Sequence, residues 1–213
     1  SIQSNMSIEE ETSYEVGGYD ESKFPSEVVE EKTIKSKNTA PIFKPSDIQP
    51  SKFIYADFKT LKSQNEDTVA WLWIPNTDIN YPVVQTSNNT YYLRNNFDKK
   101  RNQAGWIFAD YRSNFKTLGR NTVIYGHNQV DSSMFGDIKK LRNTEDWFKN
   151  NDNKFIYLAT ENASYVFKII SIYSTKPNPY YIQHGMGNDT EYRAFLDDIV
   201  SKNEVKDVYD EVS

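Results

Sequence analysis

Short blocks of apolar residues, separated by polar ones, run along the chain from about residue 51 onwards. Six of these blocks are four to eleven residues long, rich in β-branched and aromatic side chains, and bounded by proline or polar residues. This pattern is typical of strands. The predicted strands are residues 67–75, 79–85, 105–110, 122–125, 155–158 and 163–173. Pro82 inside the second block indicates an edge position or a bulge.

Three further blocks repeat their apolar residues at intervals of three and four, which predicts helices with one buried face. These are residues 51–64, 132–141 and 190–201, and a short helical turn is predicted over 90–93. Many short strands with a few helices among them, and no regular strand–helix–strand alternation, predict a mostly β (α+β) fold such as a barrel.

Residues 1–50 have a different composition from the rest of the chain. They are rich in Glu, Ser and Lys, contain prolines at positions 25, 41, 45 and 50, and show almost no apolar periodicity. Such a segment cannot bury enough surface to offset the entropy of ordering it. We therefore predict an acidic, proline-containing arm or linker over residues 1–50 and one domain over residues 51–213, a size usual for a single domain.

Charge and composition then exclude several classes of function. A net charge of -5 argues against a nucleic-acid binder, which needs a basic face, and gives no support for adsorption onto anionic lipid. No stretch approaches the roughly 18 apolar residues that span a bilayer. We expect a soluble chain, with any membrane anchor lying outside it. The chain has no cysteine, which excludes disulfides and thiolate metal sites within it.

His127 is the strongest candidate for acid–base chemistry. It follows the apolar block 122–125, where a strand would give way to a loop, and this is a rigid place to hold an imidazole that transfers protons. The only other histidine, His184, is expected to be solvent-exposed in a polar loop. A single histidine after a strand is more often a structural residue than a catalyst, so the neighbouring motifs have to decide.

Several motifs surround His127. Residues 105–112 read Gly-Trp-Ile-Phe-Ala-Asp-Tyr-Arg, residues 121–128 read Asn-Thr-Val-Ile-Tyr-Gly-His-Asn, and residues 134–137 read Met-Phe-Gly-Asp. In this order they closely resemble the region around the catalytic histidine of class B sortases, which are bacterial cell-surface cysteine transpeptidases. Further similar segments are residues 71–75, 79–85, 89–93 and 180–182. The resemblance extends over about residues 55–213.

This resemblance implies a sortase-type β-barrel of about eight strands, with an N-terminal helix and helical insertions. It also implies a reaction in two acyl transfers, which avoids direct attack of an amine on an unactivated amide. A cysteine thiolate would attack the Thr carbonyl of a C-terminal sorting signal on a surface protein, and the amine of a peptidoglycan precursor would release the product. His127 would protonate the departing amine and deprotonate the incoming one.

The resemblance further implies no cofactor and no metal. The protein would act as a monomer on the extracellular face of the cell membrane of a Gram-positive bacterium. Its partners would be the sorting-signal peptide and the cell-wall amine.

Matching positions suggest the residues of a substrate groove. Asn89 would hydrogen-bond the peptide, Leu93 would wall an apolar subsite, and Tyr181 and Ile182 would form the opposite wall. The alternatives are that Leu93 and Ile182 are core residues and that Asn89 satisfies a local turn. Asp110 and Arg112 are expected to form a structural ion pair rather than a catalytic acid and an oxyanion donor.

The sequence departs from the family pattern at its end. Class B sortases carry Thr-Leu-x-Thr-Cys shortly after the last predicted helix and an arginine on the next strand, whereas this chain ends at Ser213. We therefore expect the last strands, the nucleophile and the oxyanion-stabilising arginine to be missing, which would leave the chain inactive on its own. The alternative function is a non-catalytic, sortase-like surface binding module. A serine or zinc hydrolase built on His127 is disfavoured, because the sequence has no Gly-x-Ser-x-Gly or His-Glu-x-x-His motif.

Overall fold

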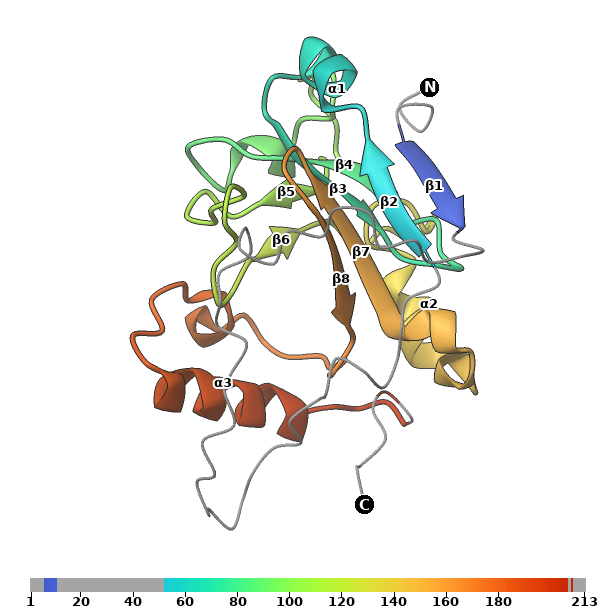
Figure 1. The fold of residues 1–213 in the computed structure, drawn as a ribbon, viewed down its shortest axis with the longest axis vertical. Helices are drawn as coiled ribbons and strands as arrows, with labels where there is room; N and C mark the ends of the chain where they lie inside the picture. The colour runs from blue at the N-terminus through green and yellow to red at the C-terminus, as the bar shows by residue number, and fades with distance from the viewer. Residues whose placement is uncertain (1–5, 11–51, 207, 209–213) are drawn as a thin grey trace, which may run out of the picture.

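The computed structural model describes residues 6–10, 52–206 and 208. Its largest element is a curled six-stranded sheet with the strand order β6-β5-β4-β3-β7-β8 (Figure 1). Its strands are β3 (Thr68–Trp73), β4 (Asn80–Val84), β5 (Phe108–Ala109), β6 (Ile124–Tyr125), β7 (Phe155–Thr160) and β8 (Ser164–Lys168). The few helices lie around this sheet, which confirms the mostly β (α+β) prediction.

The sheet pairs its strands unevenly. The central strand β3 pairs antiparallel with both β4 and β7 over long registers. In contrast, β4 and β5 are parallel and pair only at Val84 and Phe108, and β5 and β6 share only two residue pairs. Within the described residues β6 and β8 end the strand order and do not pair with each other, so the barrel is only partly closed. Pro82 is paired with Trp71 but has no partner on the β5 side, which fits a residue without an N–H donor.

The prediction of a helix over residues 51–64 is wrong in its first half. Lys52–Ala56 form strand β2, which pairs antiparallel with β1 (Met6–Glu10), and only Phe58–Gln64 form a helix, α1. The Asp57 side chain accepts a hydrogen bond from the Thr60 N–H and so caps the helix where it begins. Tertiary contacts of β2 with β7 and β8 outweigh the helical spacing of its apolar residues. Most of the predicted arm lies outside the described residues.

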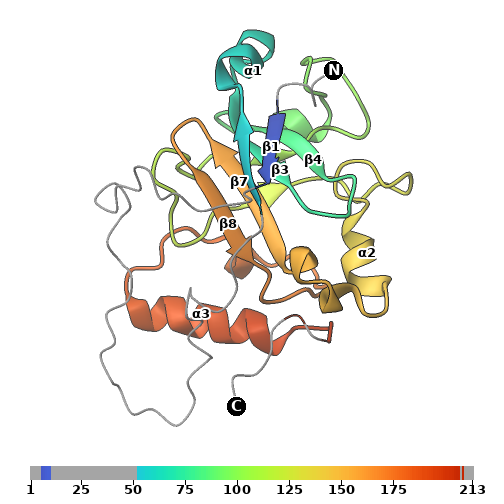
Figure 2. The same cartoon turned by 45° about the vertical axis from the view of Figure 1, so that its right-hand side comes forward.

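The other helices begin later or match the prediction. The helix expected from residue 132 starts only at α2 (Ile138–Asn143), because Ser132 and Met134 adopt left-handed backbone angles (φ 69° and 53°) in the turn before it. Helix α3 (Asp189–Ser201) begins one residue before its prediction and crosses one end of the sheet, as both ribbon views show (Figures 1 and 2). Short 3₁₀ turns are η3 (Tyr91–Leu93), η4 (Trp147–Lys149), η5 (Asn151–Lys154) and η6 (Pro179–Ile182).

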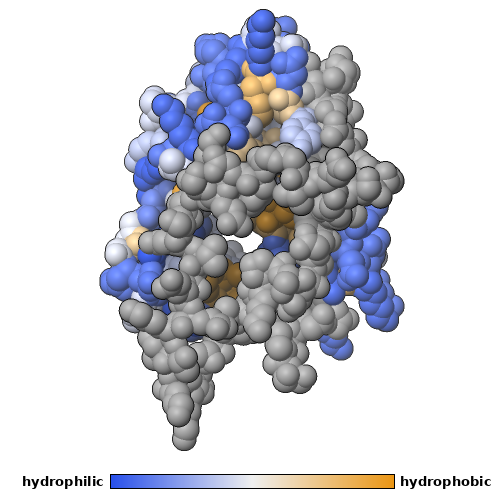
Figure 3. Space-filling model, in the orientation of Figure 1, coloured by the Kyte–Doolittle hydropathy of each residue, from blue (hydrophilic) through white to orange (hydrophobic). Residues whose placement is uncertain are grey.

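Apolar side chains pack on both faces of the sheet. Trp71 and Leu72 are neighbours on β3 but belong to separate buried clusters, as expected from the alternation of side chains along a strand. The cluster of Leu72 includes Val83, Ile107, Met134 and Leu141, and the cluster of Trp71 includes Tyr92, Phe97, Phe108 and Tyr157. Outside this core, the described surface seen in Figure 3 is mostly hydrophilic. Among the described helices, none is long and apolar enough to cross a membrane.

Candidate active site

His127 lies two residues beyond the end of β6, as the sequence predicted. The residue before it must be small, because a Cβ on Gly126 would lie 2.4 Å from Ile107 Cδ1 and 2.8 Å from Phe135 Cδ2. The His127 carbonyl accepts a hydrogen bond from the Phe135 N–H at 2.9 Å, which closes the following turn. The backbone of His127 is therefore held on both sides. The residue itself is half-buried.

The imidazole is also oriented by the opposite loop. His127 Nε2 lies 3.0 Å from the carbonyl oxygen of Leu93. A carbonyl only accepts, so this contact requires a proton on Nε2 and leaves Nδ1 as the nitrogen that can exchange one. Within the described residues, Nδ1 has no hydrogen-bond partner. For a neutral imidazole, this contact fits the tautomer that carries its proton on Nε2.

Leu93 owes its position to Gly105. Gly105 has φ of +59°, and a Cβ there would lie 2.4 Å from the carbonyl oxygen of Tyr92 and 2.8 Å from that of Leu93. Only a residue without a Cβ lets the two backbones lie this close at the 91–93 turn. The Leu93 side chain is 37% exposed, so it is not a core residue, and it lies two residues after the equally exposed Tyr91.

Asn89 joins its loop to the end of β5. Its Nδ2 donates to Asp110 Oδ2 at 2.8 Å, and its Oδ1 accepts from the Tyr111 N–H at 2.9 Å. Both partners are more than twenty positions away in sequence, so Asn89 does not merely satisfy a local turn. One Nδ2 hydrogen remains for a further acceptor.

Tyr181 and Ile182 lie together in η6, and both side chains are half-buried. The Tyr181 ring packs edge-on against Tyr173 and Tyr180, with centroids 5.6 and 5.3 Å away. Lys202 Nζ lies 5.6 Å from the centre of the Tyr181 ring. Ile182 is therefore neither fully buried core nor fully exposed, and Tyr181 stands in an aromatic cluster at the edge of the molecule.

Asp110 and Arg112 form the ion pair that the sequence predicted. The guanidinium donates from Nε to Asp110 Oδ1 and from Nη2 to Oδ2, both at 2.8 Å, and Tyr125 Oη donates to Oδ2 at 2.9 Å. Burial alone would raise the pKa of this fully buried carboxyl, but hydrogen bonds from Arg112, Tyr125 and Asn89 hold the pKa well below its usual range. Burial and the bond to Asp110 raise the pKa of Tyr125 to about 12.

The prediction of a solvent-exposed His184 is wrong. Its side chain is only 17% exposed, and Nε2 lies 3.0 Å from Ser113 Oγ. The loop that carries it folds back onto the end of β5, and the nearby Met186 is buried. His184 Nε2 is also 3.9 Å from Asp110 Oδ1. The polar sequence around His184 gave no signal of this burial.

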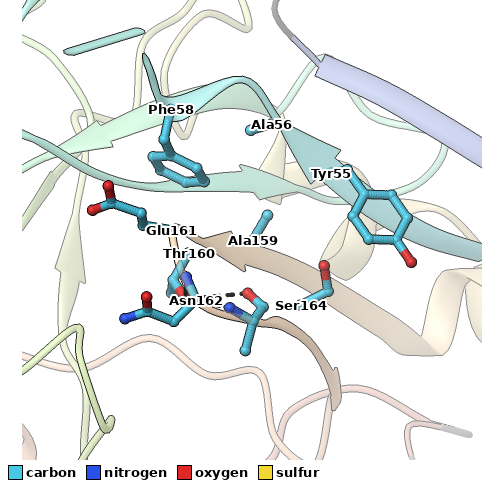
Figure 4. Close-up of a pocket in the computed structure, with 9 residues that line it drawn as sticks. Tyr55, Ala56, Phe58, Ala159, Thr160, Glu161, Asn162 and Ser164 are labelled. Atoms are coloured by element: carbon cyan, nitrogen blue, oxygen red, sulfur yellow. Dashed lines mark hydrogen bonds between the residues drawn. The ribbon is translucent and has the colours of Figure 1, made fainter. Parts of the chain in front are cut away.

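A separate hollow of about 210 Å³ lies where β2 and the start of α1 meet the turn between β7 and β8 (Figure 4). Its lining includes Tyr55, Phe58, Asn162 and Glu161, and the Glu161 carboxylate is paired with Lys62. None of the predicted site residues lines it. In the described part of the chain, no group of three or more acidic, histidine or cysteine side chains could hold a metal ion.

The structure thus holds an oriented histidine at a strand end of a partly closed β-barrel. Comparison with known families shows what class of protein this is, since the Sortase domain model matches residues 72–209. The chain belongs to the sortase family.

Its relatives are class B members. Sortase B of Listeria monocytogenes is 36% identical over 140 residues, which cover 66% of this chain and 56% of the relative. Sortase B of Staphylococcus aureus is 33% identical over 149 residues, or 68% of this chain and 59% of the relative. The chain thus spans little more than half the length of these curated relatives.

Solved structures give the same result. Sortase B from B. anthracis superposes with a TM-score of 0.65 at 36% identity, covering 73% of this chain and 70% of that structure. A Staphylococcus aureus sortase B–substrate complex has a TM-score of 0.61 at 31% identity, with 73% and 69% covered. The predicted sortase-type fold is confirmed.

Proposed function

We propose that this protein serves as a class B cysteine transpeptidase, which cleaves a C-terminal sorting signal of surface proteins and joins the Thr carbonyl to a cell-wall precursor amine. The observation that carries this proposal is the orientation of His127 by the Leu93 carbonyl, inside a chain of the sortase family. With Nε2 engaged, Nδ1 is the nitrogen that donates a proton to the departing amine and later accepts one from the incoming amine.

This reaction needs a thiolate, and these 213 residues contain no cysteine to supply it. As it stands, the polypeptide cannot form a thioacyl intermediate, and we propose that it is inactive alone. The residues present supply acid–base catalysis and peptide binding. A non-catalytic surface binding module with the same fold is the second candidate, favoured only by the missing thiol.

The peptide groove is formed by Asn89 and Leu93 on one side and by Tyr181 and Ile182 on the other. Asn89 keeps one amide hydrogen for a peptide carbonyl, and the exposed Leu93 side chain offers an apolar contact. The similarity to a sortase B–substrate complex and to a sortase B complexed with triglycine supports a peptide donor and an amine acceptor. We expect the protein to act as a monomer at the extracellular face of the cell membrane.

The nucleophile is tested by the intact mass of the protein purified from its source organism, before and after treatment with a thiol alkylator. A mass above 24.8 kDa that gains one alkyl group is the expected result. A protein without a reactive thiol that binds sorting-signal peptides, but does not cleave them, would instead support the binding module.

A further inference from the structure

A single buried carboxylate connects the two walls of the candidate groove. Asp110 is fully buried at the end of β5 and accepts five hydrogen bonds. One of them comes from Asn89 Nδ2, on the wall that also carries Leu93. Another comes from Tyr125 Oη, two residues before His127. One wall and the histidine strand therefore both attach to the same carboxylate.

The opposite wall attaches to it through Arg112. The guanidinium Nη2 donates to Asp110 Oδ2 at 2.8 Å and to the carbonyl oxygen of Ile182 at 3.0 Å. The planar fork of arginine fixes the direction of both bonds, which an ammonium group would not do. Since Arg112 is held at Nε and Nη2 by a fully buried carboxylate, its bond to Ile182 ties this wall to Asp110.

A second support comes from Asn121, three residues before β6 begins. Asn121 Nδ2 donates to the carbonyl oxygens of Tyr181 and Gln183, at 3.1 and 2.9 Å. These bonds hold the same wall as Arg112 but do not involve Asp110. A variant that lacks the Arg112 bond should therefore keep the Asn121 bonds, and the reverse. The contributions of Arg112 and Asn121 to holding this wall can thus be measured separately.

We propose that Asp110, acting through Arg112 and Asn89, is a positioning residue that fixes the separation of the two groove walls. It does not touch the peptide. The importance of Asp110 for peptide binding rests on the proposed function. Its effect on the order of residues 89–93 and 179–184 does not. Ion pairs at a protein surface usually contribute little, whereas here the carboxylate is buried and every bond to it is charge-assisted.

Amide hydrogen exchange, followed by mass spectrometry, tests this proposal. Asp110→Asn keeps the shape of the side chain but removes its charge, so exchange should rise about tenfold or more in both 89–93 and 179–184. Arg112→Gln should raise exchange in 179–184 only. Asp131→Asn is the matched control, because Asp131 is exposed and its carboxylate accepts hydrogen bonds from Ser133, two positions along the chain.

If Asp110→Asn does not fold, Arg112→Gln decides the question, and Asn121→Ala serves as a comparison that removes the support independent of Asp110. Both variants should loosen residues 179–184 while β3 and β7 keep their protection. Unchanged exchange in 179–184 in Arg112→Gln would overturn the proposal, and so would a uniform rise throughout the sheet.

Peptide binding is then measured with a library of capped hexapeptides that each contain one threonine. Arg112→Gln should weaken binding about tenfold, and Arg112→Lys should not restore it. If the unaltered protein binds no peptide, the proposed function fails, while the exchange data still decide the role of Asp110.

Discussion

Nε2 of His127 lies 3.0 Å from the carbonyl oxygen of Leu93, 34 positions away in the sequence. This contact links the imidazole to the 91–93 turn, which Gly105 approaches closely. Under the proposed function, proton transfer and peptide positioning both depend on this short stretch of backbone.

Gly105→Ala should disturb this contact. An alanine at φ +59° is strained, and its Cβ would press on the carbonyls of Tyr92 and Leu93. We expect the free energy of unfolding, measured by urea denaturation, to fall by about 1–3 kcal/mol. Nitrogen chemical shifts of the His127 ring should move as Nε2 loses its acceptor. Unchanged ring shifts would mean that Gly105 does not hold the turn in place.

Gly126→Ala should destabilise the protein through packing alone. The new methyl group would overlap Ile107 and Phe135, and overpacking of this kind costs about 1–3 kcal/mol. Gly185→Ala is the matched control, since a Cβ there meets nothing within 4 Å, and its effect should stay within about 0.5 kcal/mol. Equal thermal midpoints for the two variants would contradict this explanation of the Tyr-Gly-His sequence.

The pKa of Asp110 makes stability depend on pH in one direction. The folded-state pKa is lower than the unfolded one, which is about 3.9. The contribution of the carboxylate is therefore complete above the unfolded pKa and is lost as the pH falls through the folded pKa. The stability difference between the unaltered protein and Asp110→Asn should be constant above about pH 5 and shrink below about pH 4. Denaturant midpoints between pH 2.5 and 7 measure it, and a pH-independent difference would refute it.

Tyr125→Phe removes one donor from the same carboxylate. A hydrogen bond to a charged group contributes about 1.5–3 kcal/mol, so the variant should lose roughly that much stability. The ring still packs against Phe108, 5.1 Å away, so the core is kept. A loss below about 0.5 kcal/mol would show that Asp110 is held well enough by its other donors.

The sequence predicted the strands and the position of His127 because alternation and strand ends are local signals. It did not predict β2, since the choice of strand over helix for 52–56 depends on β1 and on contacts with β7 and β8. The sequence also did not predict the turn at Met134, because a methionine rarely adopts left-handed backbone angles.

The candidate site was likewise predicted in part. The ion pair of Asp110 and Arg112 was expected, but not its bonds to Asn89 and Ile182, which join segments up to 70 positions apart. Asn121 was overlooked, although it begins the motif that ends at His127. The signal that could have indicated Asn121 is its place as a polar residue just before the apolar block that leads to His127.

The catalytic role that we propose for His127 is tested most directly on the protein expressed from the source organism's gene. Cleavage of a fluorogenic sorting-signal peptide is measured for His127→Ala and for Asn128→Ala, an exposed neighbour that serves as control. We expect kcat/KM to fall about 10²–10⁴-fold in the first variant and turnover to stay near normal in the second. Near-normal turnover by a folded His127→Ala would contradict the proposed role.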